Sequence, residues 1–469
     1  METILDKDKV ALALDVHEKP RSKLQWTILS LQHVFAMFGS NVLVPMIINS
    51  TICPSGNFHL MNPSMALFAS GLGTLIYIAL TKAKVPVYLG SSFAYMIAVG
   101  TSYKNYGNSV FFAIMFVGLI YILFGITIYF LGSGFVKKIF PPIVVGPLIV
   151  IIGLSAAPAS LVNSGITGKD WSEVGNVNYP QWIAFLIAFI TFIAIVIITI
   201  KAKGISKIIP VIIGIAVGFL TAIIIHICKP SWGLIDTSKI TDVSKWEWYP
   251  SFQPFWKDIT VKKIGLSIIA IAPLAIVGMS EHIGDHISIG MITNKDFVKD
   301  PGLHRTLIAD GVSIIVDGFI GGPPNTTYGE NTAVVGITRI ASVWVTGFAA
   351  VIAMILAFIA PVNQTISMIP APVMGGIGMV MFGFISINGI RILATSDVDF
   401  LNMKNIFVTS TILVLGIVLS IIGDSIFGLP GIGIAAFAGI LLNLLLPEKM
   451  HQGMLYFSIF NRKKSKKSK

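Results

Sequence analysis

Residues 321–339 read GGPPNTTYGENTAVVGITR, and they interrupt a chain that otherwise consists of long apolar runs. Hydrophobic residues make up 54% of the sequence and charged residues only 12%, about half of what a soluble protein carries. The apolar runs are about 20 residues long, enough to cross a bilayer as a helix, and they lack the alternation of barrel strands. The sequence therefore predicts an all-α polytopic membrane protein, with one span broken by two prolines and a carboxylate, Glu330.

The apolar runs predict 14 transmembrane segments. Some of them are shorter than the roughly 20 residues of a full span. The segments are expected at residues 27–49, 64–81, 86–101, 109–131, 140–160, 180–200, 207–228, 264–287, 303–320, 328–339, 341–361, 370–390, 405–423 and 430–447.

The loops of this topology account for the formal net charge of +11. Lys and Arg gather in alternate loops and in the tail NRKKSKKSK, which is typical of loops on the cytoplasmic side. The loop 229–263 also carries lysines, but long loops weigh less in that rule. We therefore expect a multi-pass protein of the plasma membrane with both termini cytoplasmic, and no binding of nucleic acid.

Two pairs of motifs repeat along the chain. PPIVVGPLIVIIG (141–153) resembles APVMGGIGMVMFG (371–383) at an offset of 230 residues, since 371 − 141 = 230. GSSFA (90–94) resembles NTTYG (325–329) at an offset of 235 residues, since 325 − 90 = 235. With seven segments in each half, the second half enters the membrane from the opposite side, which gives an inverted repeat as in many secondary transporters.

This repeat divides the chain into five parts. They are a cytoplasmic N-terminus (1–26), a first repeat (27–228), a long extracellular loop (229–263), a second repeat (264–447) and a basic cytoplasmic tail (448–469).

The two halves carry matching interruptions, VPVYLGSSFAYMIAVG (85–100) and PPNTTYGENTAVVG (323–336). Such a pair of broken hydrophobic segments indicates a transporter's binding site near the midplane of the membrane. Extended backbone survives at that depth only if it is buried in protein or lines a cavity. Its free polar groups and the ends of two half-helices can then bind a polar ligand. The alternative is two loops with ordinary helix caps, which Thr326 and Thr327 would also suit.

Several ionisable residues lie inside predicted spans, where charge is costly and usually functional. Glu330 would begin a half-helix, and Glu281 and Asp285 share a helical face in the sequence MSEHIGDHISIG. Two carboxylates so close in a low dielectric cannot both ionise easily, which suits a proton carrier. One alternative is a mixed acid and His zinc site that includes His282 and His286. Another is that Asp285 and His286 reach the interface and are solvated.

Three further polar residues remain open in role. His33 is expected to cap or orient the broken backbone rather than touch ligand. Asp310 and Asp317 share a helical face and would either pair with hydroxyls or histidines on other helices or help to relay protons.

The two cysteines, Cys53 and Cys228, give no metal motif; free thiols are expected, with a bridge between them as the alternative.

At these residues the sequence resembles the nucleobase–cation symporters of the nucleobase–ascorbate transporter family, and within it the bacterial uracil permeases. The resemblance covers roughly residues 25–445, and it is carried by SLQHVFAMFGS, VPVYLGSSFAYM, EHIGD, DPGLHRTL, PNTTYGEN and IPAPVMGGIGMVMFG. It implies a 14-helix fold in two subdomains. A core would contain segments 1–4 and 8–11, and a gate would contain segments 5–7 and 12–14.

The resemblance also implies a site. Two short antiparallel strands around Ser92–Phe93 and Thr327–Tyr328 would cross in the core, and glycines of the repeated motif would smooth the interface between core and gate: Gly146, Gly153, Gly376 and Gly383. The substrate-binding residues would be Glu281, Glu330, Phe93, Gly329, Tyr328, Ser40 and Phe382. Proton coupling would involve Asp285, Glu281 and His282, and the orienting residues would be His33, Gln32 and Asn331.

The implied function is proton-coupled uptake of uracil by alternating access. Uracil offers two N–H donors and two carbonyl acceptors, to which two carboxylates and free backbone N–H groups are complementary. Known uracil permeases have His where Asp285 stands and Tyr where Phe382 stands, so the details of proton coupling are open. The alternatives are a xanthine or purine substrate, sodium coupling, and an anion transporter or channel. No enzyme activity, cofactor or metal is expected, and a homodimer through the gate domain is an expectation of the resemblance alone.

Overall fold

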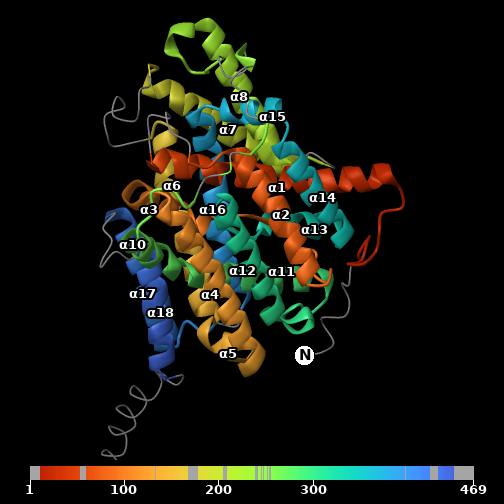
Figure 1. Cartoon of the computed structure of the whole chain (residues 1–469), viewed down its shortest axis with the longest axis vertical. Helices are drawn as coiled ribbons and strands as arrows, with labels where there is room; N and C mark the ends of the chain where they lie inside the picture. Colours follow the sequence, from red (N-terminus) through yellow and green to blue (C-terminus); the bar gives the residue numbers. More distant parts are fainter. Residues whose placement is uncertain are drawn as a thin grey trace, which may run out of the picture.

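The computed structural model describes most of the chain, and the description below is confined to these residues: 11–52, 60–132, 134–166, 178–203, 209–237, 241–243, 246, 248–250, 252, 255–396, 398–422 and 431–447. They form a mostly helical bundle with one very small sheet (Figure 1). Cys53 and the basic tail lie outside the described residues, so the cysteine bridge and the tail's position stay predictions.

The first half of the chain contains eight described helices and one strand. They are α1 (Lys23–Ile52), α2 (Pro63–Leu80), β1 (Leu89–Ser91), α3 (Met96–Tyr106), α4 (Ser109–Leu131), α5 (Gly134–Ile139), α6 (Pro142–Asn163), α7 (Gln181–Lys201) and α8 (Pro210–Cys228).

The second half follows a similar order. It contains α10 (Val261–Ile271), α11 (Ala275–Thr293), α12 (Leu303–Ile320), β2 (Asn325–Thr327), α13 (Gly329–Thr338), α14 (Val343–Ala357), α15 (Ala360–Ser367), α16 (Ala371–Thr395), α17 (Met403–Ile422) and α18 (Gly431–Leu445).

The apolar helices confirm a multi-pass membrane protein. Among the described residues, nine helices are long and apolar enough to cross a membrane, and α14 and α15 form a further candidate bent by 80°. A helix overlaps every predicted segment, but α3, α13 and α18 have only 11, 10 and 15 residues. The number of crossings therefore stays a prediction.

The two predicted interruptions meet in a small antiparallel ladder. Leu89 pairs with Thr327 and Ser91 pairs with Asn325. Backbone hydrogen bonds extend the pairing by one residue at each end, since Ser92 N–H donates to the Pro324 carbonyl at 2.8 Å and Tyr328 N–H donates to the Tyr88 carbonyl at 3.0 Å. The strands thus lie slightly before their expected positions, because Phe93 and Gly329 already begin helical turns.

Side chains of neighbouring helices satisfy the outer edge of β1. Asn41 Oδ1 on α1 accepts from both the backbone N–H of Ser91 at 2.9 Å and its hydroxyl at 2.7 Å. Thr74 Oγ1 on α2 accepts from the Leu89 N–H at 2.9 Å. The buried backbone polar groups of β1 therefore have partners on both sides, as an apolar environment requires.

A carboxylate performs the same task for β2. Asp317 on α12 accepts from the Asn325 N–H through one oxygen and from the Asn325 side-chain amide through the other, both at 3.0 Å. Both residues are completely buried. Asp317 therefore pairs with a strand residue rather than with a hydroxyl or a histidine, and its part in proton relay stays a prediction.

Close approach of the Tyr328 ring to the backbone of β1 requires glycine at position 90. A Cβ atom built on Gly90 would lie 2.5 Å from the ring of Tyr328, whose hydroxyl donates to the Ser91 carbonyl at 2.8 Å. The aromatic ring therefore lies directly against the β1 backbone.

The glycines of the repeated motif do not lie where they were expected. Gly146 and Gly153 on α6 pack against α16, and Gly376 on α16 packs against α7, while nothing lies within 4 Å of a Cβ built on Gly383. These contacts join helices assigned to the gate with one another. Gly146, Gly153 and Gly376 therefore pack within the expected gate rather than between core and gate, because small residues serve wherever two helices approach closely. For Gly383 the expectation stays a prediction.

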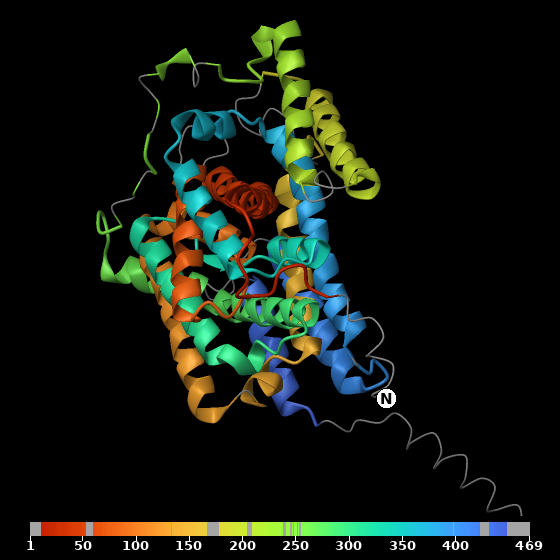
Figure 2. The same cartoon turned by 90° about the vertical axis from the view of Figure 1, so that its right-hand side faces the viewer.

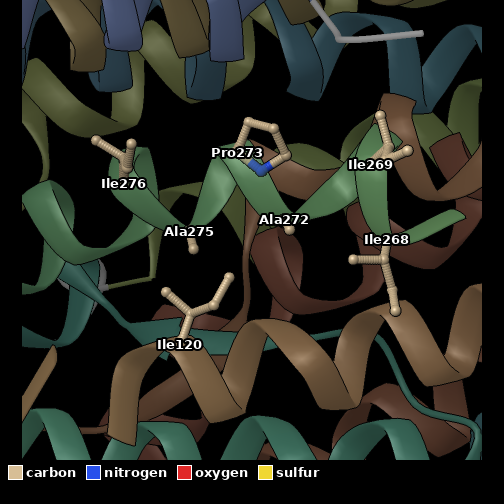
Figure 3. Close-up of a pocket in the computed structure, with 7 residues that line it drawn as sticks. All are labelled: Ile120, Ile268, Ile269, Ala272, Pro273, Ala275 and Ile276. Carbon is tan, nitrogen blue, oxygen red and sulfur yellow. The ribbon is translucent and has the colours of Figure 1, made fainter. Parts of the chain in front are cut away.

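An apolar groove marks the break between α10 and α11. Pro273 lies in a single turn of 3-10 helix between the two helices, and seven apolar residues line the groove (Figure 3): Ile120, Ile268, Ile269, Ala272, Pro273, Ala275 and Ile276. This lining offers no side-chain group that could hold a polar ligand. The polar residues predicted from the sequence lie elsewhere, around the ladder.

The stability of Asp317 variants tests whether the ladder supports the fold. Asp317→Leu should destabilise the protein, because it leaves two buried donors of Asn325 unpaired at about 1–3 kcal/mol each. Asp317→Asn, which keeps one acceptor oxygen, should cost less. Thermal unfolding of the purified protein in detergent measures both, and equal stability of the wild type and the Leu variant would contradict this account of the ladder.

Candidate functional site

The ladder brings the starts of two short helices to one place. Because β1 and β2 are antiparallel, the helical turn that begins at Phe93 follows the end of β1 beside Asn325, and α13 begins at Gly329 beside Leu89. The first-turn N–H groups of a helix have no partner within the helix, and its N-terminal end carries partial positive charge. The centre of the molecule therefore presents two sets of hydrogen-bond donors.

Glu330 lies in the first turn of α13, where the helix dipole favours a negative charge. Its Oε1 atom accepts a hydrogen bond of 2.6 Å from the hydroxyl of Ser40 on α1. Two residues predicted for the same site are thus in contact. The hydrogen bond fixes one carboxylate oxygen and leaves the carboxylate partly exposed.

Glu281 and Asp285 approach Glu330 from α11. Asp285 Oδ2 accepts a hydrogen bond of 2.6 Å from the Thr327 hydroxyl at the end of β2. Glu281 lies within electrostatic range of both other carboxylates, and its Oε2 atom is buried without a hydrogen-bond donor among the described residues. This oxygen is therefore free to accept a hydrogen bond from a donor outside the chain.

Next to Glu330, Asn331 ties α13 to α1. Its side-chain amide donates to both Nδ1 and the backbone carbonyl of His33, at 3.2 and 3.1 Å. Because His33 Nδ1 accepts, the ring is neutral in this arrangement. Gln32, also largely buried, precedes His33 on the same helix. The three residues predicted to orient the site therefore lie together beside the first turn of α13.

Aromatic side chains border the same region. Phe93 and Phe382 make an edge-to-face contact with ring centroids 5.8 Å apart, and they come from opposite halves of the chain. Tyr328 is buried, and its hydroxyl already donates to the Ser91 carbonyl. The phenylalanines are thus placed to contact a flat apolar surface, whereas the tyrosine ring supports the ladder.

Gly329 lies between two polar side chains. A Cβ atom built on it would lie 3.5 Å from Asp285 Oδ1 and 3.9 Å from the amide nitrogen of Asn388 on α16. Asn388 was missed by the sequence analysis. The sequence could have indicated Asn388, because an amide side chain is unusual within an apolar run such as 370–390.

The histidines of α11 face away from the carboxylates. His282 Nδ1 lies 2.8 Å from Asp310 Oδ2, its Nε2 lies 3.1 Å from the Thr306 hydroxyl, and both His282 and Asp310 are fully buried. Asp310 therefore pairs with a histidine on another helix, one of the two roles left open for it. His282 lies behind the carboxylates, within the packing of α11 on α12.

His286 is buried, so the suggestion that it is solvated was wrong. Its Nδ1 atom lies 2.7 Å from the His282 carbonyl, which can only accept, so Nδ1 carries the hydrogen. Tyr77 on α2 then donates its hydroxyl to Nε2 at 2.6 Å. Tyr77, another residue not foreseen, supplies a partner because α2 packs closely beside the histidine pair.

This arrangement also bears on the zinc alternative. Asp285 points toward Thr327 on β2 and lies beside Gly329, whereas His282 and His286 point toward α12 and α2. Within the described residues, no three His, Cys, Asp or Glu side chains converge as a metal-binding group. The acidic side chains and the histidines of residues 281–286 thus face different neighbours. The geometry gives no support to the zinc alternative.

Comparisons with known proteins give a consistent classification. The model of the Permease family matches residues 24–424. The uracil permease of Bacillus caldolyticus is 38% identical over 93% of this chain and 95% of its own length, and that of Bacillus subtilis (strain 168) is 38% identical over 95% and 97%. Among solved structures, the murine Solute Carrier 26 family member A9 anion transporter shares the fold, with a TM-score of 0.61 at 12% identity over 92% of this chain and 69% of its own.

The geometry predicts which carboxyl groups react with a hydrophobic carbodiimide. The partly exposed Glu281, Asp285 and Glu330 should be modified in the folded protein, whereas the enclosed Asp310 and Asp317 should not. Peptide mass spectrometry identifies the modified residues, with denatured protein as the control in which all five react. Equally fast modification of Asp310 or Asp317 in the folded protein would contradict the described site.

Proposed function

The chain belongs to the Permease family, and on that premise we propose that it imports uracil across the plasma membrane together with protons. The observation that carries the proposal is the group of Glu281, Asp285 and Glu330 around the starts of two short helices. In particular, Glu281 Oε2 is a buried acceptor that has no donor among the described residues.

The chemistry of uracil fits this group. Its two ring N–H groups would donate to Glu281 and Glu330, and its two carbonyl oxygens would accept from backbone N–H groups near Phe93 and Gly329. A hydrogen bond to a charged group is worth about 1.5–3 kcal/mol, whereas a buried donor left unpaired costs about 1–3 kcal/mol. A ring without this donor pattern would therefore bind much more weakly.

The aromatic residues and the relatives support the same substrate. Phe93 and Phe382, which contact each other edge to face, would together form an aromatic wall against the flat ring. The relatives that match nearly the whole chain are named uracil permeases. The neighbouring carboxylates oppose an anionic substrate at this place, so the shared fold with an anion transporter does not favour anion transport here.

Proton coupling would depend on Asp285 and Glu281. Three carboxylates at one buried place repel one another, so binding of a proton becomes favourable. Asp285 is held by the Thr327 hydroxyl and lies beside Gly329, close to the proposed substrate position. The His282–Asp310 pair lies behind it as a further group that can hold a proton.

Helix packing supports the proposed division into inverted repeats. Such a repeat requires that each contact have a counterpart with the halves exchanged. The contact of α4 with α12 has its counterpart in α14 with α2, that of α7 with α8 in α17 with α18, and that of α6 with α17 in α16 with α7. Figure 2 shows α7 and α8 as a pair at one end of the molecule.

The same contacts support a core and a gate. Helices α1–α4 pack mainly with α10–α14, and α6–α8 pack mainly with α16–α18. The short helices α5 and α15 connect the two groups at equivalent places, after α4 and after α14. Movement of one group against the other would expose the site to each side of the membrane in turn.

Uptake of radiolabelled uracil, in a host without its own permease, tests the substrate. Uptake should be blocked by excess uracil but not by xanthine. Glu330→Gln should reduce it about tenfold or more, the effect of weakening one charged hydrogen bond. Asp296→Asn is the matched control, because the side chain of this exposed residue makes only local surface contacts with Lys299, an ion pair and a hydrogen bond from its backbone N–H. Absence of uptake by well-expressed wild type would reject uracil as the substrate, and inhibition by xanthine would indicate a purine transporter.

Proteoliposomes that contain a pH-sensitive dye test the coupling ion. Addition of uracil in sodium-free buffer should acidify the interior, because each uracil enters with a proton. Asp285→Asn should abolish the acidification, while exchange of internal for external uracil continues. If accumulation requires a sodium gradient and no protons move, coupling is to sodium.

A further inference from the structure

A segment before α1 is joined to the far end of the site's half-helix. Residues 13–18 lie along the linker that connects α13 to α14 (Figure 2). Ala13 N–H donates to the Arg339 carbonyl at 2.7 Å, and Ala341 N–H donates to the Leu14 carbonyl at 2.9 Å. Leu14 and Ile340 form a parallel β-bridge. The segment thus pairs with the linker through a single β-bridge and the backbone hydrogen bonds on either side of it.

The pairing continues beyond Leu14. Val343 N–H donates to the Val16 carbonyl at 2.9 Å, and the Ser342 hydroxyl donates to the Glu18 carbonyl at 2.5 Å. The indole N–H of Trp344 donates to the His17 carbonyl at 3.2 Å. The two backbone pairs, Ala341 with Leu14 and Val343 with Val16, are each separated by two residues in both segments, which fixes the register between them.

Side chains anchor the segment to the rest of the core. Val16 is 1% exposed and belongs to an apolar cluster that joins α2, α11, α12 and α13. Leu89, a residue of the ladder itself, is a member of that cluster. Asp15 pairs with Lys295, just after α11, at 2.6 Å. The ammonium group of Lys295 lowers the pKa of Asp15, so the pair persists at neutral pH and is lost as the solution becomes acidic.

These contacts join the far ends of the two helices that carry the carboxylates. Helix α13 has Glu330 in its first turn and Arg339 at its C-cap, and with 10 residues it is only about 15 Å long. An isolated helix of this length is marginal, so its position depends on what holds its ends. Helix α11 carries Glu281 and Asp285 and ends shortly before Lys295.

We propose that residues 13–18 form a positioning strap, which sets the spacing between Glu330 on α13 and the carboxylates on α11. The strap touches no substrate, and it acts through the α13–α14 linker and the apolar cluster around Val16. The proposal rests on the proposed function for its transport test, but the spacing itself is measurable without substrate.

Val16→Asp, with His17→Asp as its control, tests the strap in the full-length transporter. Both variants introduce the same charge in adjacent positions, but Val16 is buried and His17 is exposed. Val16→Asp should raise the KM for uracil about tenfold, as expected when one hydrogen bond to substrate is misplaced. His17→Asp should leave KM unchanged. Less transporter in the membrane with an unchanged KM would show that the segment only stabilises the fold, and would overturn the proposal.

Spin labels at Ile287 on α11 and Ile337 on α13, both exposed, report the spacing directly. Val16→Asp should broaden their distance distribution, and Val16→Ala should do so to a smaller degree if the Asp variant does not fold. An unchanged distribution in Val16→Ala would overturn the proposal even if the protein does not transport uracil.

Cross-linking separates a fixed strap from a movable one. A disulfide between Leu14→Cys and Ile340→Cys, at the β-bridge, should leave uptake and KM at wild-type values. Loss of uptake on oxidation, restored by a reductant, would show that the segment must detach during transport and would contradict fixed positioning.

Discussion

The architecture depends on one constraint, which is that extended backbone inside a membrane protein must have all its polar groups satisfied. Two segments of this chain are extended near its centre, and each satisfies the other through the β1–β2 ladder. The remaining groups are satisfied by Asn41, Thr74 and Asp317, which come from three different helices. The ladder thus holds together helices from both halves of the chain, and it fixes where two short helices begin.

The buried polar residues divide into two groups. Asp317, the His282–Asp310 pair and the Tyr77–His286 pair have their partners within the protein, and they hold helices in register. Glu281, Asp285 and Glu330 are only partly exposed and retain acceptor capacity. The second group concentrates carboxylate acceptors beside the helix starts, although Asp310 Oδ1 also has no donor among the described residues. We infer that this concentration is what makes the centre a binding site for a polar, planar ligand.

Much of this could be predicted from the sequence, because its strongest signals are local. Apolar runs predicted the helices, and Pro323, Pro324 and the matching interruption at Gly90 predicted the broken segments.

What could not be predicted is which polar groups meet. Asp310 and Asp317 lie on one helix face with the same spacing signal, yet one pairs with a histidine and the other with a strand. His286 was misjudged because its burial depends on Tyr77, which is 209 residues away in the chain. The strap shows the same limit, since nothing in residues 13–18 indicates the linker that they bind.

The most direct test of the central claim is an experimental structure of the protein with uracil bound. The pyrimidine ring should lie against the aromatic wall of Phe93 and Phe382. Its two N–H groups should lie within hydrogen-bond distance of Glu281 and Glu330, and its carbonyl oxygens should face the first-turn N–H groups near Phe93 and Gly329. Uracil bound away from the β1–β2 ladder, or bound there without contact to either glutamate, would contradict it.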